Sequence, residues 1–480
     1  MTVDGDGSPV SRTWWVLPYC AGALAVFVVA GVIIGLRHTS QTAHPASQAA
    51  PMPAELFPDA LFKELTGDVQ TGNETALLGL ASAAARPALT SWWENLRAIG
   101  FTTGAVIPTA ELDAVHINSH GDGTTVVLAG AHSALDALDL NGKPEVPMTR
   151  YRVGLHFASP TATGQITTWQ PLDDAPWDQG SSLYVRKAAG VVVAGPAADR
   201  TLVDQTLPVA ETAAAYDIGL MRHVSPGFLQ QRGFVVFVSG SAPVRDRWLA
   251  TAPQPQGWPP LFLGARAVQL PGPGVSADTA VNKDQSTLVG AISDDSMGGI
   301  RVVLAPPEPA TPAASHDETV TLVREFMLDI QGAHDEELAN GVPVKAVPSW
   351  TEEGLAVAVQ ALFEANPDPA PRTYSFAALT AALRKLPRSY RSGVYPTTSE
   401  LFGPSVTTDE DWGYVAASTY EYIHSRYNIS KMMVSGMVVY LPGHATPFAN
   451  VYKSGTNGNN LVFFGIHSIR LGWQPWLARL

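Results

Sequence analysis

The stretch Thr319-Val-Thr-Leu-Val-Arg-Glu-Phe-Met-Leu-Asp-Ile330 separates two kinds of sequence. Segments with alternating apolar residues, typical of strands, precede it, and segments with apolar residues at helical spacing follow it. The stretch itself is predicted to be a helix, in which Arg324 and Leu328 lie four residues apart and share a face. We therefore expect an α+β fold in which this helix lies between a β-rich half and a helical half.

Length and composition limit the possible functions of the chain. Its 480 residues are too many for one core and predict about two to four domains. With 30 basic and 43 acidic residues, the net charge is -13, which argues against nucleic acid or anionic lipid as a partner. Cys20 is the single cysteine, so no intramolecular disulfide and no cysteine-based zinc site is possible.

The amino-terminal region predicts a membrane anchor. Residues 14–36 contain no charged residue, and as a helix they would be about 35 Å long, enough to cross a bilayer with some tilt. A cleavable signal peptide is the alternative, although its apolar region is shorter, about 7–15 residues. We expect a cytoplasmic tail (1–13), a transmembrane helix in the cytoplasmic membrane (14–36) and a flexible linker (37–54). The protein would then be single-pass, with its bulk outside the cytoplasm, although the flanking charges barely decide the orientation.

Residues 55–180 predict helices followed by a curved antiparallel sheet. The helical segment 61–85 is interrupted at Gly72-Asn73, and a third short helix carries Trp92-Trp93. Strands are predicted at 114–119, 124–129, 150–157 and 165–170. This order resembles the nuclear-transport-factor-like α+β cone. The histidines of the region, which we interpret as ordinary surface or core residues, are His116, His120, His132 and His156.

Residues 181–480 predict a sheet (181–305) followed by helices (315–480). The strands expected are 183–185, 190–194, 233–238, 265–270, 287–292 and 299–304, with 233–238 central because it is wholly apolar and rich in β-branched and aromatic residues. A helix is expected from about 195 to 216. After a linker at 306–314 and the helix at 319, further helices are expected at 355–363, 374–386 and 414–427, and a closing helix at the end of the chain.

Three motifs in this region carry a family resemblance. They are Gly190-Val-Val-Val-Ala-Gly-Pro-Ala-Ala-Asp-Arg200, Pro348-Ser-Trp-Thr-Glu-Glu-Gly-Leu-Ala356 and Asp411-Trp-Gly-Tyr-Val-Ala-Ala-Ser418. Over residues 183–440 the chain resembles actinobacterial membrane-anchored gluzincin-like zinc peptidases, which often carry an α+β cone before the peptidase domain. The resemblance implies a mixed β-sheet followed by a mostly helical half, with zinc ligands from a His-Glu-x-x-His helix and from a glutamate on a second helix.

The metal-binding positions of that motif have changed. Arg324 and Leu328 stand where the two histidines would be, and a guanidinium or an aliphatic chain cannot bind zinc. Glu325, at the place of the general base, remains only as a remnant, and Glu353 stands at the third ligand. We expect no metal, no cofactor and no confident catalytic residue. We predict instead an Arg324–Glu353 ion pair between the two helices, with Arg324, Glu353 and Tyr414 as ligand-binding residues.

The resulting functional hypothesis is a membrane-anchored, extracytoplasmic pseudo-peptidase that binds a peptide or protein ligand at the cell envelope. One alternative is an active zinc metallopeptidase with atypical ligands. The other is a structural or sensory ectodomain in which the cone is the binder.

Overall fold

The computed structural model covers most of the chain after the predicted linker. It describes residues 55–56, 58–108, 115–135, 148–178, 180–224, 231–250, 265–274, 291–305, 312–339, 349–387, 410–426, 428–436, 473 and 475–480, which all belong to one compact unit, 52–480. The predicted tail, transmembrane helix and linker lie outside these residues. No helix among them combines the length and the hydropathy of a membrane span. The fold is a mixed α+β fold, as predicted.

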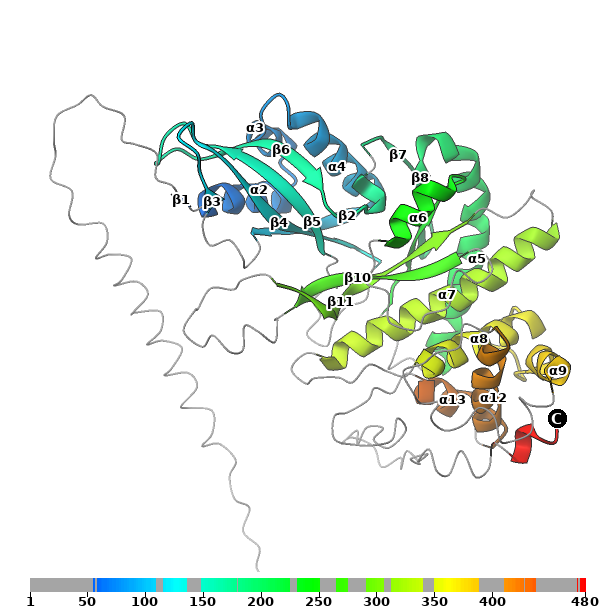
Figure 1. The fold of residues 1–480 in the computed structure, drawn as a ribbon. Helices are drawn as coiled ribbons and strands as arrows, with labels where there is room; N and C mark the ends of the chain where they lie inside the picture. Colours follow the sequence, from blue (N-terminus) through cyan, green and yellow to red (C-terminus); the bar gives the residue numbers. More distant parts are fainter. Residues whose placement is uncertain are drawn as a thin grey trace, which may run out of the picture. The chain divides into compact units, whose positions relative to one another are not determined.

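Three helices and a four-stranded antiparallel sheet make up the first part of the fold (Figure 1). The helices are α2 (Asp59–Thr71), α3 (Glu74–Gly79) and α4 (Arg86–Ile99). The sheet has the order β2 (Phe101–Pro108), β4 (Asp122–Ser133), β5 (Met148–His156) and β6 (Gln165–Pro171), and a separate pair joins β1 (Glu55–Leu56) to β3 (Val115–His116). Strand β2 was missed by the sequence analysis.

The predicted helix break at Gly72-Asn73 is confirmed. Gly72 ends α2 in the left-handed conformation, with φ 71°, and its N–H donates to the Val69 carbonyl. The Asn73 side chain then caps α3 by accepting a hydrogen bond from the Ala76 N–H at 3.3 Å. A glycine in the left-handed conformation thus ends one helix, and an asparagine side chain begins the next.

Aromatic side chains fill the space between these helices and their sheet. Tyr151 on β5 stacks on Trp169 of β6 with ring centroids 4.6 Å apart, and Trp92 of α4 packs edge-on against Tyr151. The Tyr151 hydroxyl donates to the Asp178 carboxylate at 2.9 Å. Burial raises the pKa of Tyr151 well above its ordinary value, so the phenol stays protonated and can make this bond.

The second sheet has five strands in the order β10 (Ala265–Gly274), β11 (Ala291–Leu304), β9 (Phe234–Val238), β8 (Val191–Pro196) and β7 (Leu183–Ala188). Its central pairs are parallel and its outer pairs are antiparallel, so it is a mixed sheet with β9 in the middle, as predicted. The strand predicted at 299–304 is confirmed as part of one longer, irregular strand, β11, which is described from Ala291. Most of the strand predicted at 287–292 lies outside the described residues.

Helices in this half are also longer or more numerous than predicted. Helix α5 (Arg200–Val224) follows a 3-10 turn at Ala197–Asp199 and continues past Pro208 in its interior. Helix α6 (Ala242–Ala250) was not predicted. Helix α7 (Pro312–Ala339) already begins inside the segment interpreted as a linker.

The mixed sheet is buried on both faces because successive side chains point to opposite sides. On one face, Phe234 and Val236 belong to a core that includes α5 and α7. On the other face, Val235 and Phe237 belong to the core of the first part of the fold. Trp177, in the 3-10 turn Pro176–Asp178, joins the two parts: its ring lies 6.1 Å from Phe237.

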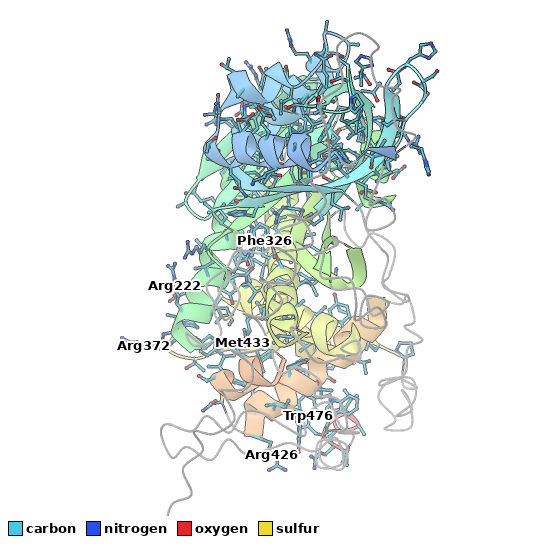
Figure 2. All side chains as sticks on the ribbon, turned by 90° about the vertical axis from the view of Figure 1, so that its left-hand side faces the viewer. Arg222, Phe326, Arg372, Arg426, Met433 and Trp476 are labelled. Carbon is cyan, nitrogen blue, oxygen red and sulfur yellow. The ribbon has the colours of Figure 1, made fainter. Side chains whose placement is uncertain are left out.

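The described part of the carboxy-terminal half is helical, as predicted. Helix α8 (Ser349–Ala365) packs against α7, α9 (Ala377–Lys385) and α12 (Glu410–Arg426), and α13 (Ile429–Gly436) packs against α12. The end of the chain docks on this half, because the Trp473 indole N–H donates to the Ser418 hydroxyl at 2.8 Å. Figure 2 shows Phe326 of α7 within the ribbon and the exposed Arg222 and Arg372 at its margin.

Candidate functional site

Helix α7 is enclosed along its middle. Every residue from 318 to 331 is buried, including the whole predicted site stretch. The helix contacts α5, α8, β10 and β11. Phe326 fixes it to the central strand, since its ring stacks on Phe234 with centroids 4.0 Å apart and an interplanar angle of 4°. The charged side chains of α7 between residues 318 and 331 therefore lie in the interior of the fold.

The residues at the motif positions lie together in this interior. Arg324 is 5 % exposed, Glu325 3 % and Leu328 5 %. The Arg324 Nη1 atom is 3.7 Å from the Glu325 Oε1 atom, so the fixed cation lies beside the carboxylate at the place of the general base. Charges removed from water in this way need a partner to remain ionised.

These residues do not fit a zinc ion. Arg324 offers only donors and Leu328 offers no ligand atom, whereas zinc takes nitrogen, sulfur or carboxylate ligands. In the part of the chain that the structure describes, no group of three or more His, Cys, Asp or Glu side chains could hold a metal ion. We therefore derive no chemical step through zinc.

The two other predicted site residues lie on the neighbouring helices. Glu353 belongs to α8, but its side chain lies outside the described part of the structure, so the Arg324–Glu353 ion pair stays a prediction. Tyr414 belongs to α12, where it is half-buried against the main core. Arg324 and Glu325 of α7, Glu353 of α8 and Tyr414 of α12 thus come from three helices, of which α8 contacts the other two.

A glycine next to Glu353 determines how closely α8 approaches α12. A Cβ atom on Gly354 would lie 2.9 Å from the Ala416 carbonyl carbon and 2.9 Å from a ring atom of Tyr420. Neither neighbour can move freely, because both belong to the buried face of α12. Gly354 is thus a requirement of the helix packing that the sequence analysis quoted but did not interpret.

The interface between α5 and α7 carries buried acidic residues that sequence reasoning missed. The Thr206 hydroxyl donates to Glu318 Oε1 at 3.2 Å, and burial raises the pKa of Glu318 to about 7. Asp217 is 0 % exposed, and neither of its carboxyl oxygens has a hydrogen-bond partner among the described residues. It lies eleven residues after Thr206, which places both on one face of α5. This spacing was available in the sequence as a signal.

Burial also controls the ionisation of Asp217. Desolvation raises the pKa of its carboxyl well above the ordinary value. The cause is the cost of an isolated charge in an apolar interior. Burial therefore favours the protonated form of Asp217 in the folded protein.

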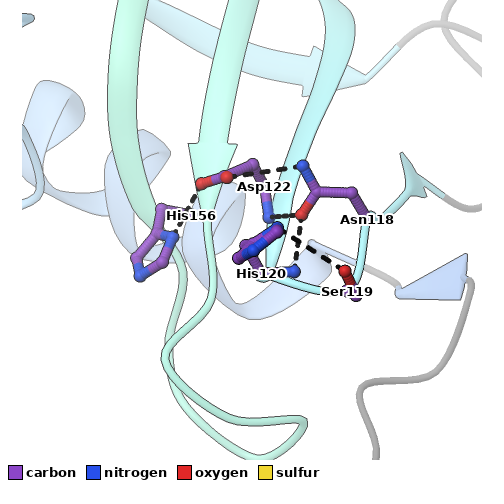
Figure 3. Close-up of polar contacts among 5 residues, drawn as sticks. All are labelled: Asn118, Ser119, His120, Asp122 and His156. Carbon is purple, nitrogen blue, oxygen red and sulfur yellow. Dashed lines mark hydrogen bonds and ion pairs between the residues drawn. The ribbon is translucent and has the colours of Figure 1, made fainter.

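Among the described residues, the histidines of the first part of the fold form no such buried site. Asp122 Oδ1 lies 2.8 Å from His156 Nδ1, and Asn118 Oδ1 accepts from the N–H groups of His120 and Asp122 (Figure 3). The hydrogen bond from His156, followed by that from Asn118, lowers the pKa of Asp122. These contacts tie the surface turn at 118–122 to β5. The interpretation of the four histidines as ordinary residues stays a prediction.

None of the protein-family models, curated proteins and solved structures compared with the chain matches it. The resemblances to gluzincins and to the nuclear-transport-factor-like cone therefore stay predictions. The functional argument rests on α7 and its neighbours.

Proposed function

We propose that this chain is a single-pass, membrane-anchored, extracytoplasmic protein whose carboxy-terminal domain is a catalytically degenerate gluzincin-like module. In this proposal the module binds a peptide or protein ligand and does not hydrolyse it. The cone ahead of it has the nuclear-transport-factor-like form.

One observation carries the loss of hydrolysis: Arg324 and Glu325 are buried, with 3.7 Å between their charged groups. A catalytic zinc site keeps an open coordination position for water or substrate, and its general base must reach the attacking water. Here the residue at the base position is 3 % exposed and lies beside a permanent cation. This arrangement supports a structural role for the former catalytic helix.

A binding role would use the neighbouring helices. Tyr414 is only half-buried, and it lies on α12, which packs against the helix of Glu353. A phenol hydroxyl and a carboxylate can bind backbone N–H groups of a peptide, since both accept hydrogen bonds. We assign Glu353 and Tyr414 to ligand contact and Arg324 to charge compensation.

The loss of hydrolysis is tested on the full-length chain purified in detergent. We expect less than stoichiometric zinc by elemental analysis, and cleavage of a quenched fluorescent peptide library no faster than with Glu325→Gln. The control is Glu364→Gln, which changes an exposed acidic residue at the end of α8. Stoichiometric zinc together with cleavage that Glu325→Gln abolishes and Glu364→Gln leaves intact would overturn the proposal in favour of an active peptidase.

Ligand binding is tested with peptides selected from a displayed random library and then synthesised. We expect Glu353→Gln and Tyr414→Phe each to weaken binding about tenfold, which is typical of a lost hydrogen bond to a charged or buried group. Glu364→Gln should leave the affinity unchanged. If neither substitution changes the affinity, the ligand does not bind at these helices, and the cone becomes the candidate binder.

A further inference from the structure

The cone region has a surface hollow of about 540 Å³ on the outer side of α4. Its lining consists of one face of that helix and the turn that precedes β7: Ala83, Arg86, Pro87, Thr90, Ser91, Glu94, Gly180, Ser181 and Ser182. The volume is within the range of about 300–1,000 Å³ common for small-ligand sites. The hollow is distant in sequence from the α7 residues and is independent of the function proposed for them.

A buried amide fixes the two walls of the hollow to each other. Asn95 of α4 is 2 % exposed, and its Nδ2 donates to the carbonyls of Trp177 and Ser181, both at 3.0 Å. Its Oδ1 accepts from the Leu183 N–H at 2.9 Å. The hollow is therefore preformed, because three hydrogen bonds hold the turn against the helix.

Two opposite charges lie in this hollow. Arg86 and Glu94 are both exposed, and no ion pair is found for either within the described ranges. The Arg86 Nη2 atom donates to the Ala81 carbonyl at 3.3 Å, which orients the guanidinium. Because α4 rises 1.5 Å per residue, eight residues place the two positions about 12 Å apart along the helix.

Hydroxyl-bearing residues also line the hollow. Thr90 and Ser91 come from the helix, and Ser181 and Ser182 come from the turn. The Ser91 Oγ atom is enclosed and has no hydrogen-bond partner among the described residues. Hydroxyls both donate and accept, so they suit a ligand whose backbone does the same.

We propose that this hollow binds a short peptide with free ends, its carboxylate at Arg86 and its ammonium group at Glu94. An extended chain spans about 3.3–3.6 Å per residue, so three residues cover about 10 Å. The side chains of Arg86 and Glu94 bridge the rest of the distance between their positions on the helix. The hydroxyls of Thr90, Ser181 and Ser182 bind the intervening amides. A phosphorylated ligand is disfavoured because Glu94 repels it, and an uncharged sugar leaves both charged groups without a partner.

The test uses trialanine and the full-length chain in detergent, with binding followed by saturation-transfer NMR and calorimetry. Exposed ion pairs contribute little binding free energy, so we expect a dissociation constant for trialanine on the order of 1 mM. Arg86→Gln or Glu94→Gln should each weaken the affinity about three- to fivefold. The matched control is Arg97→Gln, on the same helix, exposed and outside the hollow. It should leave the affinity unchanged.

Blocked peptides identify which end binds where. Acetylation of the trialanine amine should weaken binding by the same factor as Glu94→Gln and make the affinity insensitive to that substitution. Amidation of the carboxylate should have the same two effects with respect to Arg86→Gln. No saturation transfer at millimolar trialanine would overturn the proposal, as would equal binding by all variants. An uncharged trisaccharide that binds as well as trialanine, with both substitutions silent, would also overturn it. Glu353→Gln affects only the α8 site, so failure here is distinct from failure of the proposed function.

Discussion

Replacing Asp217 by asparagine should stabilise the protein, and the gain should increase with pH. The wild-type carboxyl is 0 % exposed, has no hydrogen-bond partner in the described structure and has a pKa raised well above its ordinary value by desolvation. Asparagine has nearly the same shape and does not titrate. The substitution therefore removes the ionisation and changes the packing little.

The magnitude follows from proton linkage. In the unfolded chain the aspartate titrates near its ordinary pKa of about 3.9. Below that pH the carboxyl is protonated in both states and contributes nothing to the pH dependence. Above it, the unfolded state loses the proton while the folded state keeps it, so folding costs about 1.4 kcal/mol more for each pH unit until the raised folded pKa is reached. The stability difference between Asp217→Asn and wild type should grow at that rate.

The assay is urea unfolding, followed by tryptophan fluorescence, from about pH 4 upward, because the linkage acts between the unfolded pKa of about 3.9 and the raised folded pKa. The control is Asp204→Asn on the same helix. Asp204 is exposed and pairs with Arg186 at 2.5 Å, so its replacement should cost at most about 1 kcal/mol and bring no gain that grows with pH. A constant difference between Asp217→Asn and wild type would refute the reasoning, because it would mean that Asp217 is ionised and paired in the folded state.

Two further predictions test the packing around α7. Gly354→Ala should cost about 1–3 kcal/mol of unfolding free energy, since its Cβ would lie 2.9 Å from the α12 backbone, whereas Gly67→Ala, with no atom within 4 Å, should gain about 0.5–1 kcal/mol. Urea unfolding of both variants checks this, and equal effects would contradict the close approach. Thr206→Val should lower the free energy of unfolding by about 1–2 kcal/mol above pH 7 and by less below it. The reason is that the Glu318 carboxyl has a pKa of about 7 and is a stronger hydrogen-bond acceptor when ionised. A loss that does not vary with pH would argue against this bond.

Local sequence signals predicted those elements whose residues repeat with one clear period. The break at Gly72-Asn73 was predicted because two short-range capping interactions decide it. Strand β9 was predicted because all five of its residues are apolar. Strand β2 was missed because Gly104 and Pro108 obscure its alternation, and its pairing with β4 shifts register between Thr103 and Val106. Such a shift depends on the partner strand, which the local sequence does not contain.

The sequence predicted that the candidate site lies on a helix, but not that the middle of this helix is buried. The spacing of Arg324 and Leu328 identified a shared face correctly. It did not show that α7 is covered on all sides, because a helix with several charges is usually amphipathic and partly exposed. The bond between Thr206 and Glu318 joins residues 112 positions apart, and no local pattern indicates such a pair.

Trp177 has a consequence for how this protein could be divided. Its ring lies against Phe101 on one side and Phe237 on the other, so the predicted boundary at residues 180 and 181 runs beside a shared aromatic core. A fragment that starts at residue 181 would expose Phe237 and Val235 to water, and a fragment that ends at residue 180 would expose Trp177. The two halves are thus not interchangeable modules. Joining either half to a different domain would require different side chains at the contact of Trp177 with Phe101 and Phe237.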